Sequence, residues 1–404
     1  ALEISMRFAP NPVRGTLTKG AAFALTAALL ASTSVPALAF DAGDAMKRIE
    51  SLVGISKATL KYDAPELSGS DVTVNNIVLQ TPNGKNEVPL GTLTMTGVSE
   101  GDNGFINVEK LDLTPIDYTH DGVTVNLGAL TMGDFALPTV EAIQNGLSQT
   151  KGTFNLDGMS VAKDGKAIVT VASMSGVATG NFPDEAMEQT VNLTDMTVDL
   201  SGLPDGDQGK QTLMALGYNT LTFDLNTKGN WQPSGELKVD QFEIAGDDIG
   251  TLGLTLDISG YTAELAKKVA ELNAKMSGEN SGAASMQLLG ELQSLTLNGG
   301  QLKFSDNSIT EKLLNFFAPQ MGTDANGLKA QAKGMLPLAL GQLGDPDLTK
   351  MVSAAVGQYL DDPKSLQIDL VPDAPVAFGE IMGAGMAAPQ TLPKVLGAKV
   401  SANQ

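Results

Sequence analysis

Few side chains of this 404-residue chain could carry out catalysis. His120 is the only histidine, and there is no cysteine. Ser-His-Asp and Cys-His triads need a histidine as the base, and a metal site built on two histidines is impossible. His120 lies in the sequence Thr-His-Asp-Gly, which is typical of a turn, where a solvated polar residue is the ordinary expectation. We therefore expect no catalytic role for His120.

Acidic residues are the remaining candidates for chemistry. Three pairs lie close together in the sequence: Asp205 with Asp207, Asp247 with Asp248, and Asp361 with Asp362. Clustered carboxylates can hold Ca²⁺, but none of these pairs has the Asp-x-Asp-x-Asp-Gly spacing followed by Glu. Each adjoins a turn or a helix start, where Asp commonly has a structural role. A hydrolase could pair two carboxylates from distant parts of the chain, and the sequence does not identify such a pair.

Nucleotide and cofactor motifs are also missing. The sequence has no Gly-x-Gly-x-x-Gly between a predicted strand and helix, and no P-loop. Trp231, the only tryptophan, lies between two predicted strands, where we expect a packed anchor rather than a ligand platform. We therefore predict a non-enzymatic protein with no catalytic residue, no cofactor and no bound metal.

Alternating apolar and polar residues, rich in Val, Thr and Leu, predict β-strands along most of the chain. Asp-Gly pairs at 121–122 and 164–165 are typical of hairpin turns. Alternation of this kind indicates antiparallel strands with one face towards water. The predicted strands are residues 71–81, 88–98, 105–113, 123–132, 152–162, 167–172, 174–179, 190–200, 221–226, 235–244, 250–258, 294–304, 365–370 and 398–402.

A change to helical spacing predicts short helices between the strands. They cover residues 138–149, 208–216, 261–276, 286–292, three segments between 306 and 363, and 378–387. The three helices between 306 and 363 are expected to begin at Asp306 or Ser308, at Asp324 and at Asp347, because Asp and Ser side chains cap helix N-termini.

These elements predict an α+β fold dominated by β-structure. We expect a long, curved antiparallel sheet of meanders, with short helices packed on one face and a helical C-terminal block. Three regions follow: 1–39, a signal peptide whose first five residues are a misplaced start or a cloning remnant; 40–300, an extended antiparallel β-region with short helices; and 301–404, mostly helical. The strand at 294–304 and the closing strands could make the last two regions one continuous body.

Two helical segments could line a hydrophobic groove. The apolar residues of the first recur at spacings of four, four, three and four, which places them on one helix face. The candidates are Tyr261, Leu265, Val269, Leu272 and Met276 on the first segment, and Leu313, Phe316 and Phe317 on the second. The alternative is that these helices cover the apolar face of the sheet as an ordinary core. If part of that face stays open, it would suit an acyl chain.

The first residues have the order of a secretory signal peptide. Arg7, Arg14 and Lys19 precede an uncharged run at 20–35, and the small-x-small sequence Ala-Leu-Ala ends at Ala39. This order predicts export and cleavage after Ala39, and hence a periplasmic protein. An uncleaved membrane anchor is the alternative, but the run is rich in Ala, Ser and Thr and would span a bilayer badly.

The net charge of the chain limits the kinds of partner that it is expected to bind. The chain has a net charge of −20, and without residues 1–39 the charge is more negative still. Nucleic acids and anionic membrane surfaces bind proteins through basic patches, so we expect neither nucleic acid nor an anionic membrane surface as a partner. No stretch after residue 40 is long and apolar enough for a transmembrane helix. Without cysteines, stability must come from burying Leu, Val, Ile, Met and Ala.

Two stretches of sequence resemble a family of uncharacterised exported proteins of proteobacteria. They comprise 216–225 with Trp231 and 248–254, and 302–314 followed by 359–368. This resemblance spans roughly residues 210–375 and implies no activity or functional residue. The alternation of meanders and short helices is also similar in architecture to envelope proteins of the AsmA-like class. That likeness implies a curved sheet that handles lipid, although the membrane anchor usual in that class is replaced here by the predicted signal peptide.

Three functions remain open from the sequence. The first is a non-enzymatic periplasmic envelope protein that binds a lipid or another hydrophobic ligand along its sheet. The second is a scaffold that binds another envelope protein through a sheet edge or its acidic surface. The third, which we favour least, is a hydrolase with paired carboxylates in a cleft.

Cleavage after Ala39 would make Phe40 the first residue of the mature protein. We expect N-terminal sequencing and intact-mass measurement of periplasmic material to start at Phe40. An Ala39→Arg variant should accumulate as the precursor, because the cleavage site needs a small residue. Unprocessed wild-type protein would contradict the prediction.

Overall fold

The structure is a computed structural model. It describes residues 40–55, 57–81, 87–144, 151–180, 182–203, 206–276, 281–342 and 344–404. The predicted signal peptide lies outside the described residues, as do the side chains of residues 270, 273–276 and 281.

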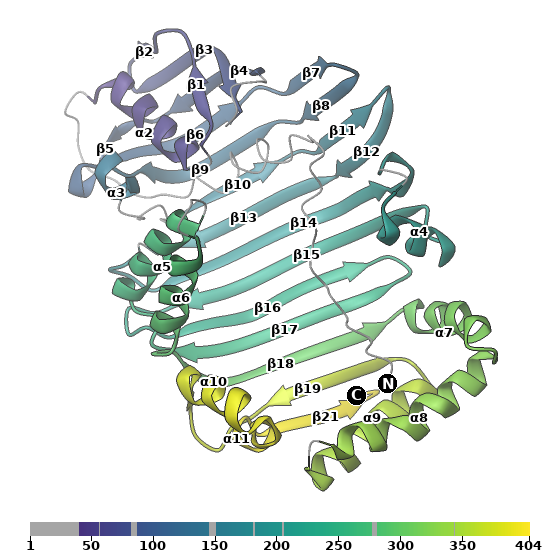
Figure 1. Ribbon diagram of the computed structural model, residues 1–404. Helices are drawn as coiled ribbons and strands as arrows, with labels where there is room; N and C mark the ends of the chain where they lie inside the picture. Colours follow the sequence, from purple (N-terminus) through teal and green to yellow (C-terminus); the bar gives the residue numbers. More distant parts are fainter. Residues whose placement is uncertain are drawn as a thin grey trace.

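The strands join one antiparallel sheet (Figure 1). They are β1 (Thr59–Lys61), β2 (Glu66–Ser68), β3 (Asp71–Gln80), β4 (Glu87–Thr96), β5 (Ser99–Glu100), β6 (Ile106–Leu113), β7 (Ile116–His120), β8 (Val123–Leu127), β9 (Leu130–Leu137), β10 (Gly152–Leu156), β11 (Met159–Lys163), β12 (Lys166–Val171), β13 (Ser173–Thr179), β14 (Met187–Asp199), β15 (Thr220–Trp231), β16 (Leu237–Gly246), β17 (Gly250–Ser259), β18 (Thr296–Asp306), β19 (Ser365–Leu370), β20 (Val376–Ala377) and β21 (Ala398–Ala402).

Helices connect the strands or follow them. They are α2 (Ala42–Gly54), α3 (Val140–Gln144), α4 (Gln208–Ala215), α5 (Ala263–Met276), α6 (Ser281–Leu292), α7 (Ile309–Gln320), α8 (Ala325–Gly341), α9 (Pro346–Asp361), α10 (Phe378–Ala387) and α11 (Leu392–Val395), with 3₁₀ turns η1 (Asp102–Gly104), η2 (Leu200–Gly202) and η3 (Pro389–Thr391).

The sheet is a meander in which each long strand pairs with the next long strand along the chain. β6 and β7 are two halves of one long strand, because β6 pairs with β9 while β7 pairs with β8. β8 and β9 are likewise two halves of one long strand, as are β10 with β11 and β12 with β13, because the two halves pair with different halves of the neighbouring strand. From β14 to β19 the strands follow one another directly, and β21 pairs with β19 at the far edge.

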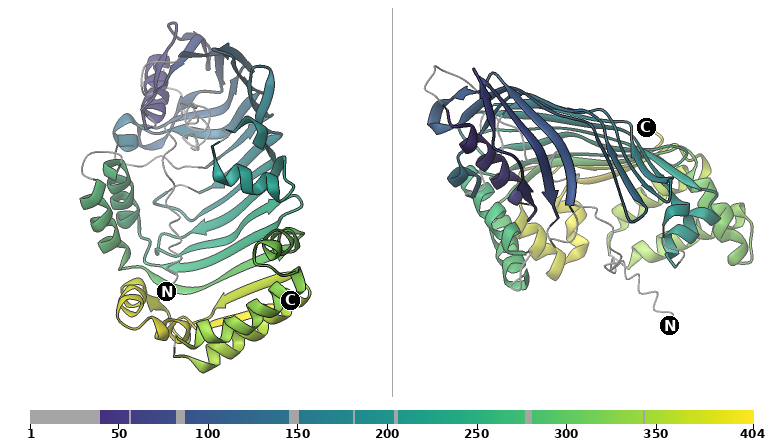
Figure 2. Two further views of the ribbon diagram at one scale, coloured as in Figure 1. Left: turned by 45° about the vertical axis from the view of Figure 1, so that its right-hand side comes forward. Right: turned by 90° about the horizontal axis from the view of Figure 1, so that it is seen from above.

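Breaks between these half-strands are aligned across the sheet. The amide of Gly128 donates to the carbonyl of Gly158, and the amide of Ala172 donates to the carbonyl of Thr194. A Cβ at Gly128 would lie 1.9 Å from the carbonyl oxygen of Asp157, so only glycine allows this approach. Interruptions of this kind bend a sheet. Figure 2 shows the resulting arch.

The register places an apolar residue of each long strand opposite an apolar residue of the next, in two rows. The first apolar row is Val74, Leu93, Leu113, Leu130, Leu156, Met174, Leu193, Leu225, Ile244, Leu252, Phe304, Leu366 and Ala402. The second apolar row is Val72, Met95, Leu111, Met132, Phe154, Gly176, Val191, Thr227, Phe242, Leu254, Leu302, Ile368 and Val400.

The residues between these rows point to the opposite face and are polar, except for one glycine. They are Thr73, Thr94, Asp112, Thr131, Asn155, Ser175, Asn192, Asn226, Glu243, Gly253, Lys303, Gln367 and Ser401. Side chains alternate between the faces of a strand, so this single register makes one face apolar and the other polar.

The helices lie on the apolar side of the arch, mostly along its two rims (Figure 2). α2 packs directly on the apolar rows of the first strands and shares one core with them. α5, α6, α10 and α11 follow one rim, and α4, α7, α8 and α9 follow the other (Figure 1). The apolar face is therefore covered by α2 at one end, is packed by α9 on the last strands at the other, and has helices along its sides.

The predicted fold class is confirmed, with some differences in detail. Helix α2 was not among the predicted elements, although its buried residues have helical spacing. α9 begins at Asp345 rather than Asp347, because the Asp345 side chain accepts the amide of Leu348 and Pro346 occupies the first turn. The predicted boundary at residue 300 falls within β18, so the sheet continues across it.

Arg48 fastens α2 to the sheet. Its guanidinium is buried, with 8% of the residue exposed. It donates to the carbonyls of Gly104 and Leu137 at 2.8 and 2.9 Å, and to the carboxylate of Asp44 at 2.7 Å. This interaction is costly to disrupt, because the carbonyl of Leu137 would stay buried without a donor. The Asp44 side chain is 40% exposed and can be hydrated instead.

We expect Arg48→Met to lower the free energy of unfolding by about 2–4 kcal/mol, since it leaves the buried carbonyl of Leu137 without this donor. Urea denaturation followed by circular dichroism measures this change. Lys47→Met is the matched control, because Lys47 is the exposed neighbour on the same helix, and it should shift stability by less than about 0.5 kcal/mol. Equal effects of the two substitutions would contradict the assignment.

Candidate functional site

The two apolar rows are covered by α2 at one end of the sheet. At the other end α9 packs on row members Phe304, Leu366 and Ala402. The rows are more accessible between these two ends. Under α2, Val74 and Met95 are 0% exposed. Farther along, the exposed fractions reach 39% for Leu252, 41% for Leu302 and 36% for Ile368. The row members on β14 to β19 are half-buried or exposed, apart from Leu193. We call these members the open apolar face: Val191, Leu193, Leu225, Thr227, Phe242, Ile244, Leu252, Leu254, Leu302, Phe304, Leu366 and Ile368.

The open apolar face has no charged residue and one polar residue. That residue is Thr227, whose hydroxyl lies 3.5 Å from the carbonyl of Val191 and is thereby used within the sheet. The charged residues of the same strands, such as Glu243 and Lys303, lie on the opposite face. The open apolar face can therefore make dispersion and hydrophobic contacts but few polar ones. Such a surface suits an aliphatic chain better than a polar substrate.

Phenylalanine rings lie against glycines of neighbouring strands on this side of the sheet. A Cβ at Gly176 would lie 2.2 Å from the ring of Phe154, and one at Gly250 would lie 2.8 Å from the ring of Phe304. The rings thus cover the glycine backbone instead of standing away from the sheet. This packing reduces how far the aromatic side chains project into the space beside the rows.

The candidate residues of α5 and the segment before it lie on one rim. Leu265 and Leu272 are 6% and 2% exposed. Leu265 packs with Ile258, Leu295 and Leu297, with Tyr261 and Val269 half-buried at the edge of this cluster. The side chain of Met276 lies outside the described residues. The buried leucines form the wall beside the apolar face rather than a surface that a ligand could touch.

The candidates on α7 lie on the other rim. Leu313 and Phe316 are half-buried against a cluster formed by Leu200, Leu216 and Tyr218. Phe317 is 41% exposed, and its ring meets that of Phe316 edge-on at 5.0 Å between centroids. The two sets of candidates thus belong to opposite rims, with the sheet between them (Figure 1).

Sequence reasoning missed the residues of the open apolar face as site candidates. Their alternation was recognised, but alternation shows only that a strand has an apolar side. Which strands pair, and in which register, decides whether these sides form one surface. The repeated Gly-x-Leu-Thr-Leu-like strand cores, such as Gly250–Leu254, were the available signal.

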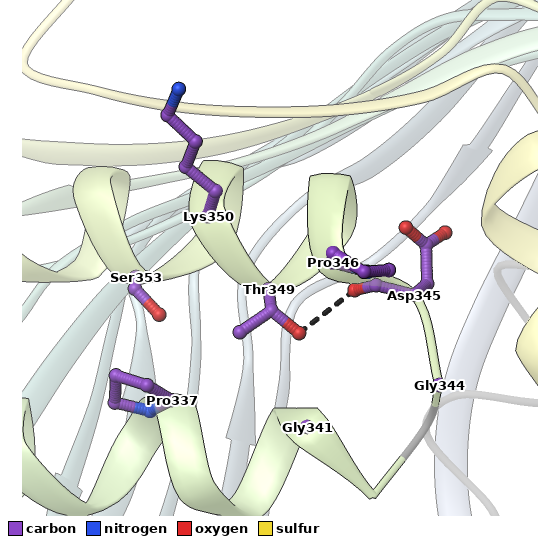
Figure 3. A pocket seen from close by; sticks show the side chains of 8 residues that line it. All are labelled: Pro337, Gly341, Gly344, Asp345, Pro346, Thr349, Lys350 and Ser353. Carbon is purple, nitrogen blue, oxygen red and sulfur yellow. Dashed lines mark hydrogen bonds between the residues drawn. The ribbon is translucent and has the colours of Figure 1, made fainter.

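A cavity of about 500 Å³ lies between α8 and α9, on one rim (Figure 3). Pro337, Gly341 and Thr349 line it, and the Thr349 hydroxyl donates to the backbone carbonyl of Asp345 at 2.8 Å. The Lys350 side chain points away from the other lining residues (Figure 3). Ser353 contributes a buried hydroxyl without a hydrogen-bond partner. The charged residues of the lining are Asp345 and Lys350; the Asp345 carboxylate accepts the amide of Leu348 as the N-cap of α9.

The other polar candidates have structural positions. His120 is the exposed last residue of β7, directly before the turn at 121–122, and lies 3.3 Å from the Asp121 carboxylate. Asp207 caps α4, while Asp205 lies outside the described residues. Trp231 is buried, and its indole donates to the carbonyl of Tyr261 at 2.7 Å, so the predicted packed anchor is confirmed. Within the described part of the chain, no three acidic or histidine side chains gather as metal ligands.

A partly buried polar cluster holds α9 over the last strands. Asp306 accepts hydrogen bonds from the Tyr359 hydroxyl at 3.0 Å and from the backbone amide of Thr310 at 3.0 Å. The Thr310 and Tyr359 hydroxyls lie 2.5 Å apart. Burial, followed by the Asp306 carboxylate, raises the pKa of Tyr359 to about 12. The cluster joins α7 and α9 to β18 and fixes the rim beside the open apolar face.

Comparison with known proteins found one matching family model, whose description gives no role. A family model described only as "Uncharacterized protein" matches residues 243–403. The match covers β17 to β21 and the helices between them, which is the part of the chain that forms the last strands and both rims at that end. No curated protein matches the chain. Among the described residues, no helix is both long and apolar enough to cross a bilayer.

We expect Tyr359→Phe to lower the free energy of unfolding by about 1–2 kcal/mol at neutral pH, because Asp306 loses a partly buried hydrogen bond. An unfolded tyrosine ionises near pH 10, whereas folded Tyr359 keeps its proton up to about pH 12. The unfolded state therefore gains stability between these values. The difference between wild type and variant should be constant below pH 10 and shrink towards pH 12 in urea titrations. A pH-independent difference would contradict the pKa assignment.

Proposed function

We propose that this protein is a non-enzymatic periplasmic envelope protein that binds a long-chain lipid, with acyl chains lying along the open apolar face. The observation that carries the proposal is the pair of apolar rows, which continue beyond the cover of α2 with Leu252, Leu302 and Ile368 accessible. Leaving such side chains in water costs about 25 cal/mol per Å² of apolar surface. A bound aliphatic chain would remove that cost.

The dimensions of the open apolar face suit acyl chains. Neighbouring strands lie about 4.8 Å apart, so the five steps from β14 to β19 span about 24 Å along the rows. The hydrocarbon core of a bilayer is about 30 Å thick, so one extended acyl chain spans about 15 Å. An acyl chain laid across the strands would fit within this length, with the polar head group towards one end.

The signal-like sequence and the family resemblances also support a role in the periplasm. The signal-like sequence at 1–39 agrees with export to the periplasm. The architectural likeness to the AsmA-like class, and the resemblance to exported proteins of proteobacteria, agree with a role in handling envelope lipids. Fold-level likeness is a weak guide to function, and the open apolar face is the stronger support.

A scaffold that adds strands at its last edge is less favoured. The outward amide of Val400 on β21 already donates to the sulfur of Met351 on α9 at 3.4 Å. Helix α9 thus lies over the edge where a partner strand would pair. A scaffold role would have to use another surface.

We expect native mass spectrometry of the periplasmic protein to show a stoichiometric lipid, identified after extraction. The double variant Leu252→Gln/Leu302→Gln should retain about tenfold less lipid, because two accessible contacts are lost. Thr251→Gln/Lys303→Gln is the matched control, since it changes neighbouring residues on the opposite face. A wild-type mass without lipid, unchanged after lipid is added, would overturn the proposal and favour a protein partner.

A further inference from the structure

The sheet has a distinct C-terminal end, formed by β19, β21 and the helices beside them. Figures 1 and 2 place α10 and α11 on one side of these strands and α8 and α9 on the other. The second apolar row stays accessible up to this end, where Ile368 is 36% exposed. Here α9 packs on Leu366 and Ala402 of the first row, so the part of the open apolar face that reaches this end is the second row at Ile368.

Large apolar side chains point into solvent on both sides of this end. On α8, Met335 and Leu338 are 59% and 75% exposed, and on α10 Met386 is 84% exposed. Val371, directly after β19, is 55% exposed. The α8 segment 334–341 has the sequence Gly-Met-Leu-Pro-Leu-Ala-Leu-Gly and carries no charge. Met335 and Leu338 are three residues apart on α8 and so lie on one side of the helix; neighbouring exposed apolar groups of this kind are typical of an interaction surface.

The charge of the chain is unevenly distributed. Residues 325–404, which form this end, carry six lysines and seven acidic residues, a net charge of −1, whereas the whole chain carries −20. The acidic body would be repelled by an anionic bilayer, but the C-terminal end would not. Charge therefore favours an approach to phospholipid with this end first.

We propose that the C-terminal end docks on a phospholipid bilayer, with Met335 and Leu338 of α8 and Met386 of α10 inserting into the interface. A flat bilayer can contact two helices that flank the last strands at the same time. A second copy of the chain that extended the sheet would need the β21 edge, where the Val400 amide is already bonded to Met351. Among the described residues no helix could span the bilayer, so insertion is shallow.

This proposal rests on the lipid-binding function proposed above. It adds that the bound lipid comes from the bilayer on which the protein docks. An acyl chain that leaves a bilayer at the C-terminal end could reach the accessible second row without crossing much water. Docking there would place the open apolar face roughly end-on to the membrane. The covered end under α2 would then point away from it.

Flotation of the periplasmic protein with vesicles of phosphatidylethanolamine and phosphatidylglycerol tests the docking. We expect wild type to float, and Leu338→Glu/Met386→Glu to bind at least about tenfold more weakly, because each charge replaces an inserted apolar side chain. Met286→Glu/Leu289→Glu is the matched control, since these residues are 77% and 54% exposed but belong to α6, which precedes β18, and not to α8 or α10. The control should float like wild type.

Native mass spectrometry of the same variants separates docking from lipid binding. Lipid retained by Leu338→Glu/Met386→Glu, together with lost flotation, supports the docking site. Wild type that carries lipid but does not float overturns the docking proposal and leaves the lipid site standing. An equal loss of flotation in the α6 control also overturns the docking proposal. The loss would then result from the added negative charge and not from the position of the substituted residues. Thermal unfolding of each variant confirms that it is folded.

Discussion

The structure depends on one constraint: every long strand has to present its apolar side to the same face in register with its neighbours. A shift by one residue would turn a strand's apolar side towards water. The first apolar row shows this throughout the sheet, from Val74 on β3 to Ala402 on β21, with each residue directly opposite the next. The same register places residues such as Asn226, Glu243 and Lys303 on the outer face.

The apolar face of so long a sheet would be exposed to water unless other elements packed on it. The helices of this chain cover that face unevenly. α2 and its anchor Arg48 close the face over the first strands, where the row members are almost completely buried. Along the later strands the helices lie at the rims and bury their apolar residues against the margins of the sheet. At the last strands α9 also packs on Phe304, Leu366 and Ala402. The rows between α2 and α9 are left more accessible, and this difference in cover is the basis of the proposed lipid site.

The curvature of the sheet and the positions of the rim helices together determine the shape of the apolar face. The aligned breaks near Gly128, Gly158 and Ala172 bend the sheet, so the rim helices on the apolar side stand on either flank of the rows (Figure 2). The polar cluster of Asp306, Thr310 and Tyr359 holds one of these flanks in place. A flat sheet of the same sequence would spread its rims apart and leave the apolar face without sides.

Local sequence patterns predict most of the secondary structure and the one-sided character of the sheet. Period-two alternation in segments such as 250–258 identifies strands with one apolar side, and four-residue spacing from Leu265 to Val269 identifies a helix, because both signals are local. Cap residues such as Asp324 were likewise readable, although Asp345 rather than Asp347 begins α9, since either Asp could act as a cap.

Only the tertiary structure decided which apolar residues are covered. Leu265 and Leu252 have equally apolar side chains, yet the first is 6% and the second 39% exposed. The difference arises because Leu265 packs against Leu295 and Leu297 at a rim, whereas Leu252 lies in the centre of the face between the rims. Strand order, register and helix placement are long-range properties that no local pattern encodes, and they alone determine where an accessible apolar surface remains.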